Sequence, residues 1–486
     1  MSRNQTTLRF LMTFCFLLAY ALTAEGQTLK LPAHEKITLK NGMTVLLMEK
    51  RGVPMISFVV IVKAGSTADP VGQEGLAFVT AGLLRKGTAK RNAQKFAEDL
   101  DFIGASFGAD AGTDFTSISA ECLTKDLDKG LDLLSDAMLH PSFPQPEVDK
   151  FLSQSIDGIK AAKDEAQSVV LNYYYGYLFG KHPYARPEGG DDLSLTRIKR
   201  DIILKFYETN YTPGNTILAV AGEFNAVQLK AKLEDFFGTW PAKGAASSTL
   251  LAPQPANGKR LLLVDKPDST QTFFAIGNVG TTVTDPDRVA IRVVNTIFGG
   301  RFTSQLNEAL RVESGLTYGA ESFFDSKKQP GAFVVYSYTK NETTEQAIDL
   351  ALKVLEKLHK EGVTAGELAS AKEYIKGQFP PSIETSGQLA RRIANRVLSC
   401  SLHRGSCCKE RFHLERWPHF NPRVGHLGAG ITKPVSDASG DDNRAVGSCQ
   451  DASPAEPKPH RACQNGKALL LDRVRMPTGY VLARWQ

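Results

Sequence analysis

Hydrophobic and polar residues alternate along several short segments of the chain, and this alternation predicts β-strands. The first such segment, residues 37–48, alternates on both sides of Asn41-Gly42, the dipeptide most typical of a tight hairpin. Between the strands that follow lie segments in which apolar residues recur every three to four positions, the spacing typical of helices. In chain order, the predicted elements of the first half are the hairpin 37–48, the strand Ile56–Val62, a helix through Leu84, the strand Thr116–Cys122, a helix Asp126–Leu139 and a helix from Glu147.

The same order of elements recurs in the second half of the chain. The dipeptides Asp69-Pro70 and Asp285-Pro286 lie 216 residues apart, and each follows a predicted strand and precedes a predicted helix. Such a repeat at one offset indicates duplication of a structural unit. The predicted elements of the second half are the strands Leu261–Val264, Thr272–Ile276 and Phe333–Thr339 and the helices Thr344–His359 and from Glu367.

Mixed hairpins and helices in this order predict an α+β fold of two homologous domains. In each domain we expect a mostly antiparallel sheet that is covered on one side by helices. The segment 242–255 is rich in Ala, Ser and Pro, which indicates a linker. We therefore place the first domain at residues 30–241 and the second at residues 256–398.

Composition adds one correction to this picture. The chain has 486 residues, 42% of them hydrophobic, and a formal net charge of +6, which excludes a disordered or collagen-like chain. However, residues 400–486 hold 13 Lys and Arg against 8 Asp and Glu, and residues 1–26 add a further +1. The body between them is neutral, so the charge does not indicate a nucleic-acid-binding protein.

The amino end has the features of a secretory signal. Arg3 and Arg9 precede the apolar run Phe10–Leu22, and Ala24 and Gly26 supply small residues for cleavage. The run is shorter than the roughly 20 residues that a membrane span needs. We therefore expect residues 1–26 to be a cleaved signal peptide and the protein to be periplasmic or secreted. The alternative is an uncleaved anchor.

Several short segments together resemble the pitrilysin/insulinase family of zinc peptidases, and the resemblance spans residues 30–398. Each segment is weak alone, but their order and spacing are specific. They are Gly65–Pro70, Gly75-Leu-Ala77 with Lys86-Gly-Thr88, Leu178–Tyr184, Tyr211–Asn215 before Ala221-Gly222, Gly299–Leu306 and Leu310–Tyr318.

Active members of that family carry His-x-x-Glu-His on the helix that follows the first Gly-Leu-Ala. Two histidines at i and i+4 share one helix face and can both bind Zn²⁺, while the glutamate activates the metal-bound water. The five corresponding positions here are Phe78-Val-Thr-Ala-Gly82, so the residues at the metal-binding and base positions are Phe78, Ala81 and Gly82. The family's third ligand, a glutamate, falls at Gly158. We expect no metal in this chain and no hydrolysis by the chain alone.

The resemblance also implies a role for Arg311 and Tyr318, which have six residues between them as in the family. There, such a pair hydrogen-bonds the substrate carbonyl opposite the zinc. A guanidinium and a phenol can together stabilise a developing oxyanion. The alternative is structural: Arg311 near a helix end and Tyr318 beside a strand are common placements. We interpret His182-Pro-Tyr184 and Tyr173-Tyr-Tyr175 as packing elements.

Residues 399–486 differ from the rest of the chain. They hold five of the seven cysteines without a spacing typical of a zinc site or a disulfide framework. The repeat predicts a further helix and strand after Leu398, equivalent to Leu195–Tyr211 and Thr216–Gly222, and neither pattern follows. We expect this segment to be disordered or translated out of frame, which leaves the second domain truncated.

These observations predict a non-catalytic subunit of an exported two-chain zinc peptidase. The resemblance implies a zinc-bearing homologous partner that supplies the metal, while this chain binds peptide and contributes Arg311 and Tyr318. The alternative is a non-enzymatic scaffold or peptide-binding protein that keeps only the fold.

Overall fold

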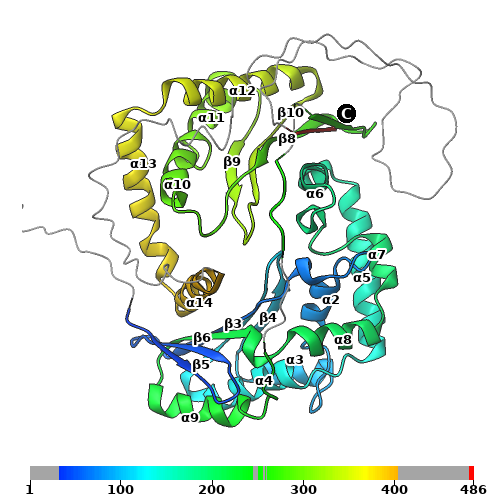
Figure 1. Ribbon diagram of the computed structural model, residues 1–486, viewed down its shortest axis with the longest axis vertical. Helices are drawn as coiled ribbons and strands as arrows, with labels where there is room; N and C mark the ends of the chain where they lie inside the picture. The colour runs from blue at the N-terminus through cyan, green and yellow to red at the C-terminus, as the bar shows by residue number, and fades with distance from the viewer. Residues whose placement is uncertain (1–31, 245–249, 256–257, 259, 403–480, 486) are drawn as a thin grey trace, which may run out of the picture.

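A computed structural model describes residues 32–244, 250–255, 258, 260–402 and 481–485. The predicted signal peptide and most of residues 399–486 lie outside this part of the chain. Two β-sheets, one in each half of the sequence, lie at opposite ends of the molecule (Figure 1). The predicted α+β architecture with two homologous sheet-and-helix units is confirmed.

The first sheet has six strands in the order β1-β2-β6-β3-β5-β4. The predicted hairpin forms, with Ile37 opposite Val45 and Gly42 at a φ of 94°, a conformation that favours glycine. Strand β6 is parallel to β2 and antiparallel to β3. The strands are β1 (Glu35–Thr38), β2 (Thr44–Glu49), β3 (Met55–Val62), β4 (Ser106–Ala111), β5 (Thr116–Leu123) and β6 (Thr216–Gly222).

One face of this sheet packs against helices α2, α3, α4, α8 and α9, which together form the largest apolar core. Strand side chains on that face, such as Val45, Phe58 and Val60, are buried against them. The helices of the first half are α2 (Leu76–Leu83), α3 (Ala93–Phe102), α4 (Leu127–Leu139), α5 (Gln145–Lys163), α6 (Ala166–Phe179), α7 (Asp192–Arg197), α8 (Arg200–Asn210) and α9 (Ala226–Phe237).

The second sheet repeats this topology in the order β7-β11-β8-β10-β9. Helices α10, α11 and α12 cover one of its faces. Its strands are β7 (Arg260–Val264), β8 (Gln271–Val279), β9 (Ala320–Asp325), β10 (Ala332–Lys340) and β11 (Val481–Trp485), and its helices are α10 (Arg288–Phe298), α11 (Gln305–Asn307), α12 (Thr344–Glu361), α13 (Ala365–Gln378) and α14 (Ser386–Leu402).

Strand β11 corrects the expectation that no strand follows Leu398. It pairs parallel with β7 and antiparallel with β8, just as β6 pairs parallel with β2 and antiparallel with β3. The sequence did not predict it because residues 481–485 lie far from the rest of the sheet along the chain. The helix expected before this strand falls outside the described residues.

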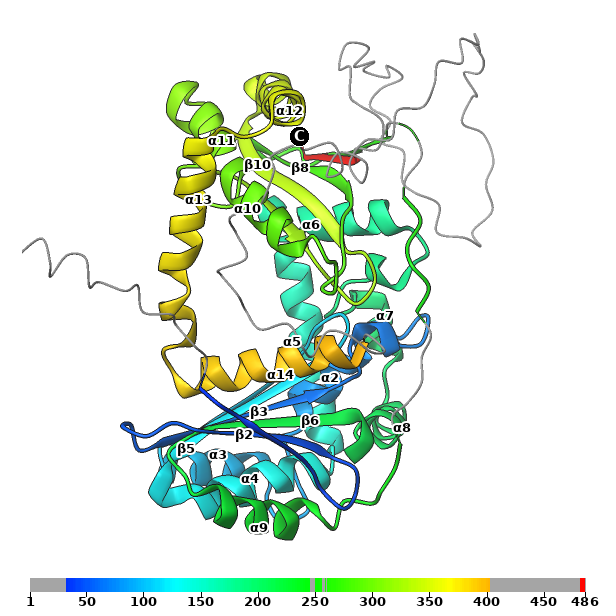
Figure 2. The same cartoon turned by 60° about the vertical axis from the view of Figure 1, so that its left-hand side comes forward.

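Each sheet is covered on its other face by a helix from the opposite half of the sequence. Helix α14 lies across the first sheet, where Leu389, Ile393 and Ala394 pack against residues of β2, β3 and β6 (Figure 2). Helix α6 packs against the second sheet, with Tyr174 and Leu178 in the same apolar cluster as residues of β8 and β10. The two predicted domains therefore exchange one helix each.

Candidate functional site

Helix α2, which carries the positions of the family's zinc motif, begins at a buried carboxylate. The two Asp69 carboxylate oxygens accept hydrogen bonds from the backbone N–H groups of Gly75 and Ala77, both at 2.8 Å. Burial raises the pKa of Asp69 to about 7, and the two N–H donors and the Arg186 guanidinium offset this only in part. Arg186 also donates to the Asp69 carbonyl at 3.0 Å and lies 3.7 Å from Glu74. The carboxylate of Asp69 therefore caps the start of α2, and the carboxylate of Glu74 lies beside Arg186.

The motif positions themselves form an apolar contact between α2 and α5. Ala81 is buried, and Phe78 and Gly82 are half-buried. The ring of Phe78 lies against the ring of Phe151 on α5, with 5.6 Å between the ring centroids. The ring of Phe151 also lies directly over Gly82. Gly158, two turns further along α5, is exposed to open space.

This arrangement does not fit zinc. The side chains of Phe78, Ala81, Gly82 and Gly158 carry no nitrogen, oxygen or sulfur that could bind a metal. The described residues contain no group of three or more His, Cys, Asp or Glu that could hold a metal ion. Glu74 and Asp69 lie nearby, but their carboxylates are held by Arg186 and by the helix start. No step of a metal-assisted reaction can be assigned to these residues.

Arg311 and Tyr318 lie in the second half, on a short π-helical turn and on the loop that follows it. The turn, η5 (Glu308–Glu313), continues α11 and ends at Ser314, whose N–H donates to the Ala309 carbonyl. Such turns occur frequently at functional sites. The guanidinium of Arg311 lies 4.7 Å from the centroid of the Phe302 ring. The side chain of Tyr318 is 78% exposed.

The structure does not bring this pair to the α2–α5 contact. Within the described residues, no hydrogen bond, ion pair or ring contact joins Arg311 or Tyr318 to either helix, and η5 packs instead against α11 and α12. The two sites therefore lie on different halves of the molecule. Two residues that matter to them, Phe151 and Phe302, were missed by sequence reasoning. Phe302 lies within Gly299–Leu306, one of the segments that carry the family resemblance, so an aromatic residue nine positions before Arg311 was the available signal.

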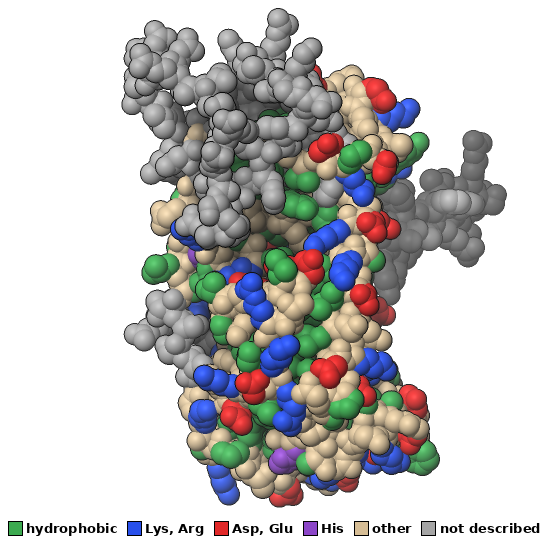
Figure 3. Space-filling view, turned by 90° about the vertical axis from the view of Figure 1, so that its right-hand side faces the viewer, with side chains coloured by type: hydrophobic (Ala, Val, Ile, Leu, Met, Phe, Trp, Pro, Cys, Tyr) green, Lys and Arg blue, Asp and Glu red, His purple; other side chains and the backbone are tan. Residues whose placement is uncertain are grey.

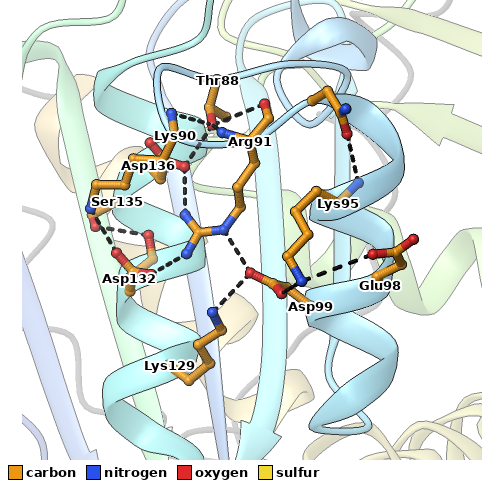
Figure 4. Close-up of polar contacts among 11 residues, drawn as sticks. Thr88, Lys90, Arg91, Lys95, Glu98, Asp99, Lys129, Asp132, Ser135 and Asp136 are labelled. Atoms are coloured by element: carbon orange, nitrogen blue, oxygen red, sulfur yellow. Dashed lines mark hydrogen bonds and ion pairs between the residues drawn. The ribbon is translucent and has the colours of Figure 1, made fainter.

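The Lys86-Gly-Thr88 segment leads into a largely buried charged network between α3 and α4 (Figure 4). Arg91 donates to Asp99 at 2.8 Å and to Asp136 at 2.6 Å, and it also pairs with Asp132. Thr88 donates to the same Asp136 oxygen at 2.6 Å. Because α3 supplies Asp99 and α4 supplies the other two carboxylates, the network joins these helices. It is a structural element.

His182-Pro-Tyr184 is confirmed as a packing element, since it joins the two halves. The Tyr184 hydroxyl donates to Asp114 at 3.1 Å and accepts from the Gln329 backbone N–H at 2.9 Å. The Lys328 backbone N–H donates to Asp114 at 2.6 Å. The buried Tyr174 likewise donates across the halves, to the Phe333 carbonyl at 2.8 Å.

Three further observations bear on the class of protein. Cys122 is buried and unbridged, and burial raises the pKa of its thiol to about 11, which disfavours the reactive thiolate. Lys and Arg side chains are interspersed with Asp and Glu over the described part of the face in Figure 3, and that part presents no basic patch to a nucleic acid. No helix among the described residues is long and apolar enough to cross a membrane.

Comparison with known proteins agrees with this fold and site. Residues 44–192 match the family described as "Insulinase (Peptidase family M16)", and residues 197–375 match the "Peptidase M16 inactive domain". The chain belongs to the M16 peptidase family, the pitrilysin/insulinase family, and is of its inactive type: the helix that should carry the zinc motif has none of its ligands.

Relatives and solved structures support the same family. A protein from Bacillus subtilis named "uncharacterized zinc protease" is 26% identical to this chain over 75% of this chain and 88% of its own length. A protein of the same description from Rickettsia felis is 27% identical over 63% of this chain and 74% of its own length. A crystal structure of a peptidase M16 inactive domain from Pseudomonas fluorescens superposes with a TM-score of 0.69 at 27% identity, covering 74% of this chain and 87% of that one. A protease from Helicobacter pylori shares the fold with a TM-score of 0.72 at 23% identity, covering 76% of this chain and 91% of that one.

Proposed function

We propose that this chain is the non-hydrolytic subunit of an exported two-chain zinc peptidase. Its partner is a homologous chain that carries the complete His-x-x-Glu-His motif and the zinc. This chain binds the peptide substrate and places Arg311 and Tyr318 against the carbonyl that is attacked. The guanidinium and the phenol then stabilise the negative charge that develops on that oxygen.

One contrast supports the proposal. The α2–α5 contact has lost every metal-binding side chain, whereas the second half keeps an arginine and a tyrosine that are accessible to another molecule. The stack of Arg311 on Phe302 restricts where the guanidinium can go, and the hydroxyl of Tyr318 lies on an open surface. Such a donor pair, without a metal of its own, can act on a carbonyl that a second chain holds at its zinc.

The test is reconstitution with a zinc-bearing M16 homologue from the same source. We expect the chain alone to cleave no peptide, and the complex to hold one zinc per pair of chains and to cleave peptides. Arg311→Ala should lower kcat/KM of the complex roughly 100-fold, because removal of one oxyanion donor typically costs that much. Tyr318→Phe should lower it less, since only one neutral donor is lost.

Matched controls separate this effect from damage to the surface. Arg301→Ala removes an arginine that also lies against an aromatic ring, that of Tyr374, but outside the proposed pair. Tyr374→Phe removes the hydroxyl of a tyrosine that is 41% exposed. Both should leave kcat/KM within about twofold. If Arg311→Ala and Tyr318→Phe behave like these controls, the proposed contact with the carbonyl is wrong.

The same experiment distinguishes the alternative. A chain that binds peptides with unchanged affinity in the presence or absence of every zinc-bearing homologue, and forms no complex with them, is a scaffold or peptide-binding protein.

Export is tested separately. We expect the mature amino terminus of the protein, isolated from the periplasm or the medium, to lie close to residue 27. A protein that keeps residues 1–26 and sediments with membranes has an uncleaved anchor instead.

A further inference from the structure

Position 82 on α2 is sterically closed. A Cβ atom built on Gly82 would lie 2.3 Å from Cζ and 2.6 Å from Cε2 of the Phe151 ring, far inside van der Waals contact. The ring is held there by two sets of contacts: it lies against Phe78 at 5.6 Å between centroids, and it packs on the core of the first half. Any side chain at position 82 must displace it.

Position 158 on α5, in contrast, has room for a side chain. A Cβ atom built on Gly158 would have no neighbour within 4 Å. Both glycines occupy positions where the family places a zinc ligand, but only Gly82 is covered by another side chain. The loss of ligands at the two positions therefore has different structural consequences.

We propose that Phe151 is a second barrier to metal binding, independent of the missing ligands. Its ring fills the space that a ligand side chain at position 82 would need. Returning histidine and glutamate to the four ligand and base positions should therefore create only a weakened zinc site. Full affinity requires removal of the phenylalanine as well, because its ring can move aside only by giving up its packing on the core of the first half, which remains when Phe78 is replaced by histidine.

The first test compares the two glycines. Alanine favours a helix over glycine, so Gly158→Ala should raise Tm. Gly82→Ala should lower Tm, because its methyl group meets the Phe151 ring. In a Phe151→Ala background the lowering by Gly82→Ala should disappear, while the effect of Gly158→Ala should persist. A rise in Tm for Gly82→Ala in the native background, equal to that of Gly158→Ala, would overturn the proposal.

The second test measures zinc directly. One variant combines Phe78→His, Ala81→Glu, Gly82→His and Gly158→Glu, and a second variant adds Phe151→Ala. A control adds Phe102→Ala instead, at a phenylalanine that is 88% exposed on α3. Zinc affinity is read from competition with a chromogenic chelator, with Tm as the measure of folding.

We expect the variant with Phe151→Ala to bind one zinc at least about tenfold more tightly than the other two, a difference of about 1.4 kcal/mol. Equal affinity in all three variants would show that the ring moves aside freely and would overturn the proposal. A folded variant with Phe151→Ala that still binds no zinc would also overturn it. If these variants fail to fold, the comparison of the two glycines decides alone.

Discussion

At the scale of single residues, Arg91 shows how a buried charge is tolerated. Its guanidinium is nearly buried and is matched by Asp99, Asp132 and Asp136 on two helices. Hydrogen bonds from Lys129, Arg91 and Lys95 lower the pKa of Asp99 well below its usual range. The folded state therefore binds a proton at Asp99 less readily than the unfolded chain does. The stability that this carboxylate adds is present above about pH 4 and is lost as the pH falls below it.

The first prediction concerns this network. Arg91→Ala should lower the free energy of unfolding by about 3 kcal/mol at pH 7, because it leaves the buried carboxylate of Asp136 without a charged partner. The difference from the native protein should shrink below about pH 4, where the carboxylates become protonated. Urea unfolding at pH 7 and pH 3.5 measures both values. Lys90→Ala serves as the control, since that exposed lysine pairs with Asp132 at the surface and should cost under about 1 kcal/mol. A cost for Arg91→Ala that is the same at both pH values would contradict the assignment.

A second prediction concerns Phe302 and rests on the proposed function. Removing the ring under Arg311 by Phe302→Ala should lower kcat/KM of the two-chain enzyme about two- to fivefold, the value of an exposed cation–π contact. The guanidinium remains, so the loss should be much smaller than for Arg311→Ala. The exposed Phe102→Ala is the matched control. If Phe302→Ala has no effect while Arg311→Ala is severe, Phe302 does not position the arginine.

At the scale of elements, strands in the middle of the first sheet are buried on both faces. Alternate residues of β2 pack in opposite directions, Val45 and Leu47 against the helices of the first half and Leu46 and Met48 against α14. This explains why β2 and β6 read as nearly continuous apolar runs. The second apolar face of the sheet must also be buried, and helix α14 from the second half of the chain packs against it.

The third prediction follows from that cover. Ile393→Ala on α14 should lower the free energy of unfolding of the first sheet by about 2–4 kcal/mol, although the residue is encoded in the second half. Hydrogen exchange of the β3 and β6 amides measures the effect locally. Asn395→Ala, at an exposed position of the same helix, is the control and should stay within about 0.5 kcal/mol. Unchanged protection of β3 and β6 in Ile393→Ala would show that α14 does not stabilise the sheet.

At the scale of the whole molecule, polar contacts join the two halves away from the exchanged helices. Tyr184 and Asp114 from the first half bind the backbone of Lys328 and Gln329 in the second. Burial raises the pKa of Tyr184 well above its usual range, with the Asp114 charge adding to the effect, so its hydroxyl stays protonated and can donate. The halves are thereby held in one arrangement.

The fourth prediction tests this junction. Tyr184→Phe should remove a hydrogen bond to Asp114 and leave the Gln329 N–H without an acceptor, at a cost of about 1–3 kcal/mol. Calorimetry should then show the two halves unfolding in more clearly separated transitions. Tyr318→Phe, on an open surface, is the control and should leave the thermogram unchanged. A uniform downward shift without separation would show that the two halves still unfold together and that Tyr184 is not what couples them.

The sequence predicted the elements with strong local patterns and missed those without them. The hairpin at Asn41-Gly42, the strand Met55–Val62 and the helix α12 follow from turn chemistry and periodicity. The edge strand β4 was missed because Ser106–Ala111 contains glycine and aspartate, which are depleted in strands, and two of its three alternating apolar residues are small alanines. It becomes a strand because β5 offers it a full ladder of partners.

Side-chain identity alone determined that the zinc motif has no ligands, since no fold can give phenylalanine, alanine or glycine side chains a metal-binding atom. The sequence also predicted the duplicated order of elements, because hydrophobic periodicity is a local property of the chain. Only the tertiary structure decided that Phe151 fills the space beside Gly82, and that α6 and α14 each cover the sheet of the opposite half. The reason is physical: apolar contact is non-directional and acts between segments that are remote along the chain, so a local pattern marks a buried face but not its partner.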